Sequence, residues 1–541
     1  MPIRRHSNDH QGPTSQRLLQ SSSHSSWFSS LPGSRSLSSL AMAVAVTMLA
    51  GCSSMFYSEQ SSNEQDWQQA LNDERDDVRQ WQLETGSADE QQNASPESSL
   101  LALMPSAEMK RLVNASLEAN PGLQQSWFTL RRLQAEKLGT RADQLPSASL
   151  SFSGQRQQDS GNSFSTGLSI SWELDLWAKL AASTTAAELD VAEQLGSWQQ
   201  TRDTLVAEVM QGWLNLVQLN NSIRLQELRL QALRKNEQAI VNRYKAGIGS
   251  LDDLDSARTS LSSGEATLAN NRYQLAEARR ALRTLLGTTD DAKLAELGLT
   301  TPQEYPAVLL PLADLPEQTL ARRPDLQSAW NGFQAASTRV DIAYKDMLPS
   351  INLSASLTDS GSSPSFFSDP VWALVGSLTQ PLFEGGKLKA AATAAEFSVA
   401  AAAQSYRDVL LTAVSEVENA IDNERTLAIR EEAIRKALGT ARSNEQRYLS
   451  RYRSGLATLL ELISVQQSRY DLEDDLNTLI YERLSNRISL GLALGLPGLS
   501  SIEMTPLHES VKTSASVSSI DTNVFNQSAS AEATSDLPET R

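Results

Sequence analysis

Cysteine and histidine are scarce in this sequence, and their positions matter more than their number. The 541-residue chain has one cysteine, Cys52, and four histidines, and neither residue type occurs between Ser53 and Leu507. The long central part therefore has no internal disulfide, no Cys or His nucleophile and no Cys or His ligand for a metal. We expect no enzyme activity, no cofactor and no metal site.

Aromatic residues, basic residues and long apolar runs are also few. Aromatics make up 6% of the chain, 47 lysines and arginines stand against 64 acidic residues, and the formal net charge is −17. A nucleic-acid partner would require a basic surface, so the charge argues against one. The mean hydropathy of −0.34 excludes a membrane protein built from many apolar helices.

The N-terminal region has the composition of an export signal. Four arginines precede a short apolar run, residues 40–50, which is too short for a permanent membrane helix. The run leads into Leu49-Ala50-Gly51-Cys52, which resembles a bacterial lipobox. We expect residues 1–51 to be a lipoprotein signal peptide and the thiol of Cys52 to carry the lipid, such as palmitate. The alternative is a free or buried thiol behind an ordinary signal.

Two further segments lack the pattern of a folded domain. Residues 52–100 are rich in serine, glutamine and acidic residues, and we interpret them as an acidic tether after the lipidated cysteine. Residues 501–541 are rich in serine, threonine and alanine and show no apolar periodicity. They are predicted to form a disordered C-terminal tail.

The central part contains an internal duplication. The tripeptide Leu-Pro-Ser at 145–147 recurs 203 residues later, at 348–350. The segment RYKAGI at 243–248 recurs 208 residues later as RYRSGL at 451–456. A period of about 200 residues is too long for a solenoid and indicates a duplicated domain. We therefore define a first repeat, residues 101–300, and a second repeat, residues 301–500.

Each repeat begins with two segments in which apolar and small polar residues alternate. The alternation covers residues 149–153, 163–174, 351–358 and 372–379, and it predicts strands. A sheet with one apolar and one serine-rich face suits the boundary between lipid and water, and Trp172, Trp177 and Trp372 would lie in an interfacial girdle. Half-buried hairpins of a soluble sandwich fit the pattern equally well.

The remainder of each repeat is predicted to be helical. Residues 180–244 contain no proline, and a helix of that length would extend about 100 Å, which requires coiled-coil packing. A similar pattern covers 387–452. Each long helix is followed by a glycine, Gly247 or Gly455, and a second helix returns over 252–286 or 458–494. Another helix is expected to begin at Pro324.

Four strands are too few to close a sheet in a membrane, because the smallest closed sheets have eight. An open sheet would leave backbone groups unpaired in lipid. If these strands cross a membrane, two or more chains must pool them, and a dimer would supply eight strands and a trimer twelve. The patterns thus predict two strands and one long helical hairpin for each repeat.

Five short motifs occur in the order typical of one family. They are WELDLW at 172–177, RRPDL at 322–326, LPSI at 348–351, QPLFEGG at 380–386 and the paired Tyr-x-x-Gly turns at 244–247 and 452–455. In this order the sequence resembles the TolC-type outer-membrane efflux protein family, in particular its acylated, OprM- and NodT-like lipoprotein branch. The resemblance covers residues 101 to 497.

The resemblance implies the fold class, a mixed membrane β-barrel plus long α-helical coiled-coil barrel to which each repeat contributes two strands and one helical hairpin. It implies a homotrimer in the cell outer membrane, lipid-anchored and inserted through its strands, with a helical tunnel that extends into the periplasm. It implies a periplasmic adaptor (membrane fusion) protein and an inner-membrane pump of the RND type as partners. The assembly would carry small molecules such as drugs across the periplasm and the outer membrane.

Three alternatives stand beside this function. A type I protein secretion system uses the same kind of outer component, and the sequence does not identify the cargo. A periplasmic coiled-coil structural lipoprotein without a pore is the second alternative. An enzyme with paired carboxylates, such as a glycosidase, is disfavoured because long coiled coils offer no deep pocket.

The resemblance also implies functional residues at the helical turns. The periplasmic tip, where the adaptor docks, would comprise Gly247, Ile248, Gly455 and Leu456. The entrance would be closed and made selective by Asp253, Tyr452 and Glu461. A ring of Glu461 carboxylates would attract cations. An equally good interpretation of Glu461 is an acid that complements the helix dipole, and Tyr452 fits a packing role in the coiled coil.

The sequence departs from the family pattern at two positions that follow the second turn. Ala457 stands where some members carry an arginine latch, and Ser464 stands where an aspartate commonly follows. The first departure argues against a salt-bridge lock at the entrance, and the second argues against a double acidic ring.

Overall fold

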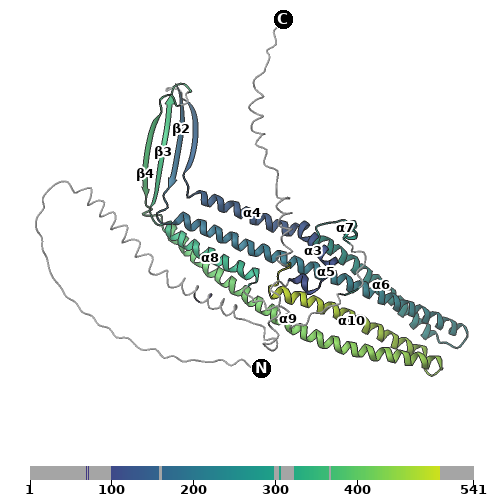
Figure 1. The fold of residues 1–541 in the computed structure, drawn as a ribbon. Coiled ribbons are helices and arrows are strands. Elements are labelled where there is room, and N and C mark those ends of the chain that lie inside the picture. Colours follow the sequence, from purple (N-terminus) through teal and green to yellow (C-terminus); the bar gives the residue numbers. More distant parts are fainter. Residues whose placement is uncertain are drawn as a thin grey trace, which may run out of the picture. The chain divides into compact units, whose positions relative to one another are not determined.

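The computed structural model describes residues 69, 71, 99–157, 161–297, 304–305, 322–364 and 367–499, all within one unit that spans residues 67–541. The expected signal peptide, Cys52, most of the expected tether and the expected tail lie outside the described residues. In chain order (Figure 1) the elements are η2 (Leu100–Leu103), α3 (Ala107–Ala119), α4 (Pro121–Ala142), β1 (Ser147–Gln157), β2 (Gly161–Glu173), α5 (Lys179–Lys245), α6 (Leu251–Leu285), α7 (Asp291–Glu296), α8 (Pro324–Lys345), β3 (Ser350–Gly361), β4 (Val371–Thr379), α9 (Lys387–Arg453) and α10 (Leu459–Ala493).

The two repeats have helices of equal length. α4 and α8 have 22 residues each, α5 and α9 have 67, and α6 and α10 have 35. Both α4 and α8 begin at a proline, which suits the first helical position because that N–H has no intrahelical partner. The predicted duplication of a strand pair followed by a long helical hairpin is confirmed.

The four strands form one antiparallel sheet in the order β1-β2-β3-β4, with β1 and β4 at its edges (Figure 1). Residues directly opposite each other in such a sheet lie on the same face. Ser169 is opposite both Ser149 and Ser356, and its hydroxyl lies 2.8 Å from that of Ser149. One face is therefore rich in hydroxyl groups. The other face carries a row of apolar side chains from all four strands, Leu150, Leu168, Leu357 and Trp372.

Both faces of the sheet are largely open in the single chain. Leu150 is 66% exposed and Trp372 is 74% exposed, although both lie on the apolar face. In the described part of the chain no second sheet covers either face, so the soluble-sandwich interpretation is wrong there. The predicted alternation of apolar and serine-rich faces is confirmed.

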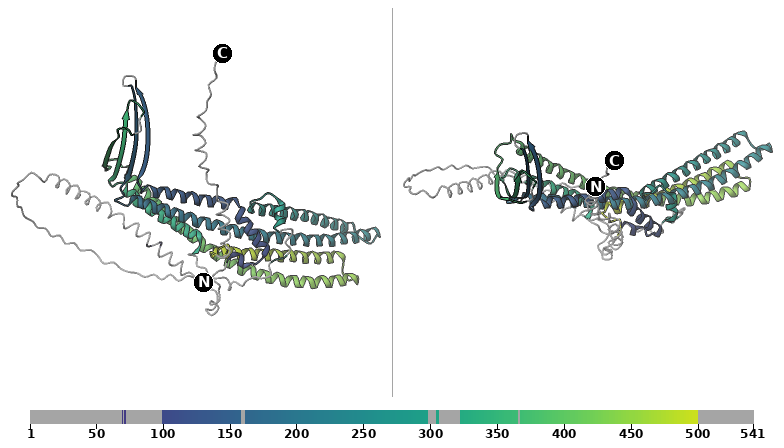
Figure 2. Two further views of the ribbon diagram at one scale, coloured as in Figure 1. Left: turned by 45° about the horizontal axis from the view of Figure 1, so that its top comes forward. Right: turned by 90° about the horizontal axis from the view of Figure 1, so that it is seen from above.

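The helices nearest the sheet form a row. α4 packs on α5, α5 on α8 and α8 on α9, so that α4 and α9 lie at its two edges (Figure 2). Farther from the sheet, α5 and α6 form one hairpin, α9 and α10 form the other, and α10 packs against α5. The sheet and the helix row therefore have matching open edges: β1 and α4 belong to the first repeat, and β4 and α9 to the second.

The main core lies where α3, α5, α8, α9 and α10 meet. An apolar stripe with spacings of three and four residues runs along α5, and four of its members are buried there, Leu205, Val209, Trp213 and Leu216, whereas Ile223 is only half-buried. The stripe packs α5 against its neighbours, as coiled-coil packing requires. Among the described helices, none is both long enough and apolar enough to cross a membrane.

Candidate functional site at the helical turns

The two turns at the ends of the hairpins have the same backbone. At the first, the N–H of Gly247 donates to the carbonyl of Tyr244 (3.0 Å) and that of Ile248 to the carbonyl of Arg243 (3.0 Å). At the second, Gly455 and Leu456 make the equivalent bonds to Tyr452 and Arg451, at 3.0 and 2.8 Å. These are Schellman motifs, and they require a left-handed residue, which both glycines supply with φ +72°.

The helices that follow the turns are capped differently. In α6 the Ser250 hydroxyl accepts the N–H of Asp253 at 3.0 Å. In α10 Thr458 and Glu461 form a reciprocal capping box: the N–H of Glu461 donates to the Thr458 hydroxyl (3.2 Å), and the N–H of Thr458 donates to the Glu461 carboxylate (2.7 Å).

This capping determines the ionisation of Glu461. The backbone N–H and then the hydroxyl of Thr458 donate to its carboxylate and lower its pKa. The side chain is exposed, so it also remains accessible to solvent and to ions. The interpretation of Glu461 as an acid at a helix N-terminus is therefore confirmed for the single chain.

A cavity of about 870 Å³ lies between the two turns. It brings together all three residues predicted for the entrance, Asp253, Tyr452 and Glu461. Of the four residues predicted for the tip, Gly455 and Leu456 line the cavity, and Gly247 and Ile248 do not. Residues far apart in the sequence thus converge at one place because both hairpins end at the same level.

Apolar side chains project from the turns over a buried apolar cluster. Ile248 and Leu456 occupy equivalent positions and are 68% and 70% exposed. Beneath them Tyr452 packs, half-buried, against a cluster formed by residues of α5, α6 and α10, namely Leu230, Leu233, Ile240, Leu254, Ala257, Leu459, Leu462 and Ile463. The predicted packing role of Tyr452 is therefore confirmed.

Two arginines in the cavity were not predicted as site residues. Arg243 and Arg453 line it together with Ala457, the residue that replaces the family's latch arginine. Positive charge is thus present in this cavity although position 457 has none. Arg243 belongs to the repeated segment at 243–248 and Arg453 to its counterpart at 451–456, so the repeat was a signal that could have found them.

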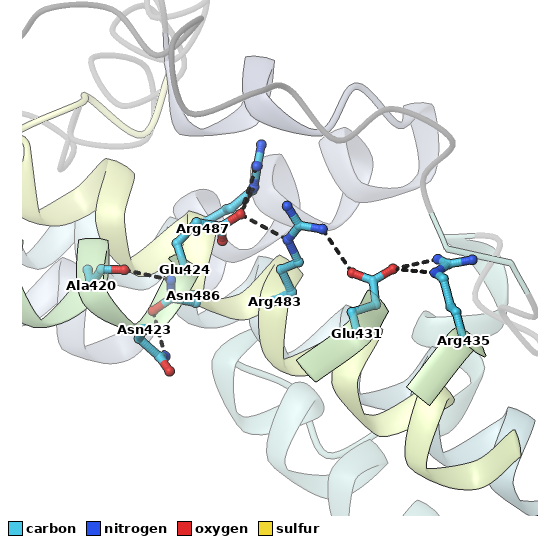
Figure 3. Close-up of polar contacts among 8 residues, drawn as sticks. All are labelled: Ala420, Asn423, Glu424, Glu431, Arg435, Arg483, Asn486 and Arg487. Atoms are coloured by element: carbon cyan, nitrogen blue, oxygen red, sulfur yellow. Dashed lines mark hydrogen bonds and ion pairs between the residues drawn. The ribbon is translucent and has the colours of Figure 1, made fainter. Parts of the chain in front are cut away.

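A second polar centre, also missed from the sequence, joins α9 to α10 (Figure 3). Glu424 of α9 accepts hydrogen bonds from Arg483 (2.9 Å) and Arg487 (2.8 Å) of α10, and Glu431 accepts from Arg483 (2.9 Å) and from Arg435. Both glutamates and Arg487 are buried. Burial alone would raise the pKa of Glu431, but the hydrogen bonds from Arg435 and Arg483 lower it. We refer to these five residues as the α9–α10 ion network.

The contacts of Arg323 and Asp325 explain the RRPD motif at residues 322–325. The Arg323 guanidinium is buried and donates to the carbonyl of Ala493, the last residue of α10, at 3.0 Å. Asp325 binds the same guanidinium through both carboxylate oxygens, at 2.7 and 3.1 Å, and Glu416 lies 2.8 Å away. Arg323 therefore fastens the end of the second hairpin to α8 and α9.

Within the described ranges, no group of three or more His, Cys, Asp and Glu side chains is arranged to hold a metal ion. The chemistry available at the turns is that of exposed carboxylates, guanidinium groups and apolar side chains around an opening between helices. Such groups attract or repel ions and bind other chains.

Known proteins are similar to this chain in sequence and in fold. The model of the outer membrane efflux protein family matches residues 112–288 and 315–496, more than half of the chain. The cation efflux system protein CusC of Escherichia coli O6:H1 is 26% identical over 397 residues, covering 72% of this chain and 86% of the relative. The outer membrane protein OprJ of Pseudomonas aeruginosa is 28% identical over 383 residues, covering 67% and 79%. The crystal structure of VceC from Vibrio cholerae shares the fold, with a TM-score of 0.67 at 21% identity, covering 74% of this chain and 100% of that chain.

The chain therefore belongs to the outer membrane efflux protein family. It is an outer-membrane component of an efflux system, and the resemblance inferred from the five sequence motifs is confirmed. The mixed architecture of a strand domain and long helical hairpins is the family's architecture.

Proposed function

We propose that this protein is the channel through which a three-component export system passes small molecules, such as drugs, across the periplasm and outer membrane. Its partners would be a periplasmic adaptor and an inner-membrane pump of the RND type. The observation that carries the proposal is the sheet, which has one apolar face, one hydroxyl-rich face and two unpaired edges. An apolar face toward lipid and a polar face toward water are what a transmembrane channel of strands requires.

Several copies must cooperate in this function. Four strands cannot satisfy their edge N–H and C=O groups within lipid, so β1 and β4 need partners. Pairing of β4 of one copy with β1 of the next would close the sheet, and α9 and α4 would meet beside it. The family resemblance favours a homotrimer, which would contain roughly twelve strands and six helical hairpins.

The turns would serve as the docking surface for the adaptor. Ile248 and Leu456 expose most of their apolar surface, and each follows a turn glycine, Gly247 or Gly455, at the end of a hairpin. Exposed apolar side chains on a rigid turn are typical of a protein interface. In a trimer six such turns would form a ring of equivalent contacts.

The cavity between the turns would form the channel entrance. Asp253, Tyr452 and Glu461 line it, and repetition of Glu461 around a ring would favour cations over anions. The capping role of Glu461 is compatible with this, because its carboxylate is exposed while it accepts the Thr458 hydrogen bonds. The chemistry is conduction and ion selection, and we propose no catalytic activity.

Anchoring to the membrane would be reinforced by lipid on Cys52. The lipobox-like sequence that precedes it supports this role. Replacement of Cys52 by serine should abolish metabolic labelling with palmitate in a Gram-negative host, while the wild-type protein is labelled. Labelling of the Cys52→Ser variant would contradict the proposed anchor.

Planar-bilayer recording with the purified full-length protein tests the channel itself. The wild-type protein should give discrete conductance steps with a preference for cations, and Glu461→Gln should reduce that preference. Asp252→Asn is the matched control, because it removes one negative charge from the first turn of α6 but does not line the cavity. Absence of conductance would favour a structural lipoprotein instead, and equal effects of the two variants would remove Glu461 from the selectivity ring.

A further inference from the structure

Two kinds of interface alternate along the sheet and the helix row. Within a repeat, β1 pairs with β2 and α4 packs on α5, and likewise β3 pairs with β4 and α8 packs on α9. Between the repeats, β2 pairs with β3 and α5 packs on α8. The interface between repeats occurs once in the chain, and the elements that would form it a second time, β4 with α9 and β1 with α4, are the open edges.

Contacts within a repeat recur at equivalent positions. Trp172 Nε1 donates to the carbonyl of Gln144 at 3.0 Å in the first repeat, and Gln380 Nε2 donates to the carbonyl of Met347 at 2.9 Å in the second. Gln144 and Met347 each follow the C-cap residue of their helix, α4 or α8. The donor side chain differs between the two repeats, but the acceptor is the equivalent backbone carbonyl in both. The junctions of helix and strand therefore have the same backbone geometry in the two repeats.

The interface between repeats is fastened by two side chains of the first repeat. Trp177, which lies between β2 and α5, donates its Nε1–H to the carbonyl of Pro349 at 2.7 Å. Lys179, the first residue of α5, places its Nζ 3.6 Å from a carboxylate oxygen of Asp346, the C-cap of α8. Glu173 lies 3.2 Å from the same Nζ.

The second repeat has one of the two fastening side chains, and the first repeat has the residue that would receive it. Lys387 is the first residue of α9, as Lys179 is of α5, whereas Gly385 stands at the position of Trp177. Asp143, the C-cap of α4, corresponds to Asp346, the C-cap of α8. Lys387 and Asp143 are exposed, and no ion pair of either occurs among the described residues.

We infer that a second copy of this chain completes the ion pair of the repeat interface, with Lys387 of one copy paired with Asp143 of the next. This inference rests on the proposed function, which requires the copies to form a ring. The contact is head-to-tail, because the second repeat of one copy meets the first repeat of the next, and such contacts form a closed ring when the rotation between copies closes. Gly385 has no side chain, so the hydrogen bond that Trp177 makes has no counterpart at the contact between copies.

A charge exchange tests the ion pair. Lys387→Asp and Asp143→Lys should each weaken association of the full-length protein, raising the dissociation constant about fivefold per interface, as expected for an exposed pair. The double variant Lys387→Asp/Asp143→Lys should recover wild-type association. Lys389→Asp is the matched control, since it removes an exposed lysine two positions along the same helix and should have no effect. The readout is the temperature at which the oligomer dissociates in electrophoresis without boiling.

Cysteine crosslinking provides a second measurement that does not depend on the strength of the pair. The variant Asp143→Cys/Lys387→Cys, treated in outer membranes with a short bismaleimide, should give covalent dimers and higher oligomers, and each single-cysteine variant should give none. An oligomeric wild-type protein without these crosslinks, or a double charge variant no more stable than the singles, would overturn the inference and leave the proposed channel intact. A monomeric wild-type protein would instead refute the ring itself, and the inference with it.

Discussion

The two helical hairpins have the same lengths and the same turns, but their interiors differ in chemistry. Positions related by the 208-residue offset that joins the two turns are apolar in the first hairpin, where they carry Leu216, Ile223 and Leu275. In the second hairpin the same positions carry Glu424, Glu431 and Arg483, three members of the α9–α10 ion network (Figure 3). One backbone arrangement is thus maintained by two different kinds of contact.

The difference shows how each interior contributes to the stability and the register of its helix pair. Apolar side chains stabilise a helix pair through burial but fix its register weakly, because neighbouring apolar residues can replace one another. A buried carboxylate between two guanidinium groups fixes the register of the two helices, because a shift of one helix along the other would leave charges unpaired in the low-dielectric interior. The second hairpin is therefore specified by charge pairing, and the first by packing.

The largest effect is expected when one half of the ion network is removed. Glu424→Ala leaves the buried Arg487 without its acceptor and takes one of two acceptors from Arg483, and it should destabilise the protein by about 3–5 kcal/mol. The measurement is guanidinium chloride denaturation of the purified protein followed by far-UV circular dichroism.

A variant in which the charged residues of the network are replaced by apolar residues provides the control for that prediction. The combined variant has Leu at 424 and 483 and Ile at 431, as the first hairpin has at the equivalent positions, and Leu at 487, which removes the remaining buried guanidinium. It should be as stable as wild type or more so. If it is as unstable as Glu424→Ala, the network contributes stability beyond charge pairing, and the contrast between the two interiors is wrong.

The sequence predicted the long helices closely, for reasons that are local. Proline-free segments with a 3–4 apolar stripe and terminal glycines gave the bounds of α5, α6, α9 and α10 to within one residue. The strand pairs followed from strict alternation of side chains. Helices α3 and α4 were not predicted, and α4 is a helix whose buried residues are only Leu123 and Leu130, so its apolar stripe is weak.

The candidate site was only partly predictable, because its contacts depend on which helix faces meet. The repeated Tyr-x-x-Gly motif located both turns, and the family resemblance supplied Asp253, Tyr452 and Glu461. The ion network could not be found in this way, because Glu424 and Arg487 lie 63 positions apart on two helices rich in exposed charges. Only packing distinguishes a buried glutamate from its exposed neighbours.

A smaller effect is expected at the base of each hairpin, where equivalent backbone carbonyls accept hydrogen bonds from different side chains. Asn120 precedes Pro121 and donates to the carbonyl of Leu285, the last residue of α6, at 2.9 Å; Arg323 precedes Pro324 and donates to the last residue of α10. Arg323→Ala should cost about 1.5–3 kcal/mol, as for bonds to charged groups, and Asn120→Ala about 0.5–1.5 kcal/mol. Equal losses in denaturation experiments would show that the charge of Arg323 adds nothing.

The two hairpins should also respond differently to acid. The pKa of Glu431 is lowered in the folded chain, so its contribution to stability is complete above the unfolded-state pKa of about 4.3 and is lost as the pH falls through the lower folded-state pKa. Protection from hydrogen exchange, corrected for the effect of pH on the intrinsic rate, should therefore fall in peptides from α9 and α10 below about pH 4.3 before it falls in peptides from α5 and α6.

The variant Glu431→Gln serves as the control for the acid response. It removes the titrating group, so exchange in the second hairpin should lose part of its dependence on pH at this acidic end. Uniform acceleration of both hairpins, in wild type and variant alike, would mean that the network does not govern the acid response.

The smallest effect is expected at the turns, where the comparison is between a capping box and a simple cap. Thr458→Ala removes the hydroxyl that accepts the N–H of Glu461, whereas Ser250→Ala removes only the acceptor for Asp253. Each change should destabilise its first helical turn by about 1 kcal/mol, and the loss should be larger for Thr458 because the carboxylate of Glu461 also loses a donor. Hydrogen exchange of the amides in the first turns of α6 and α10 measures the two losses side by side, with Thr458→Ser, which keeps the hydroxyl, as the matched control. Faster exchange in the serine variant than in the alanine variant would contradict the capping-box explanation, because only the alanine variant lacks the acceptor.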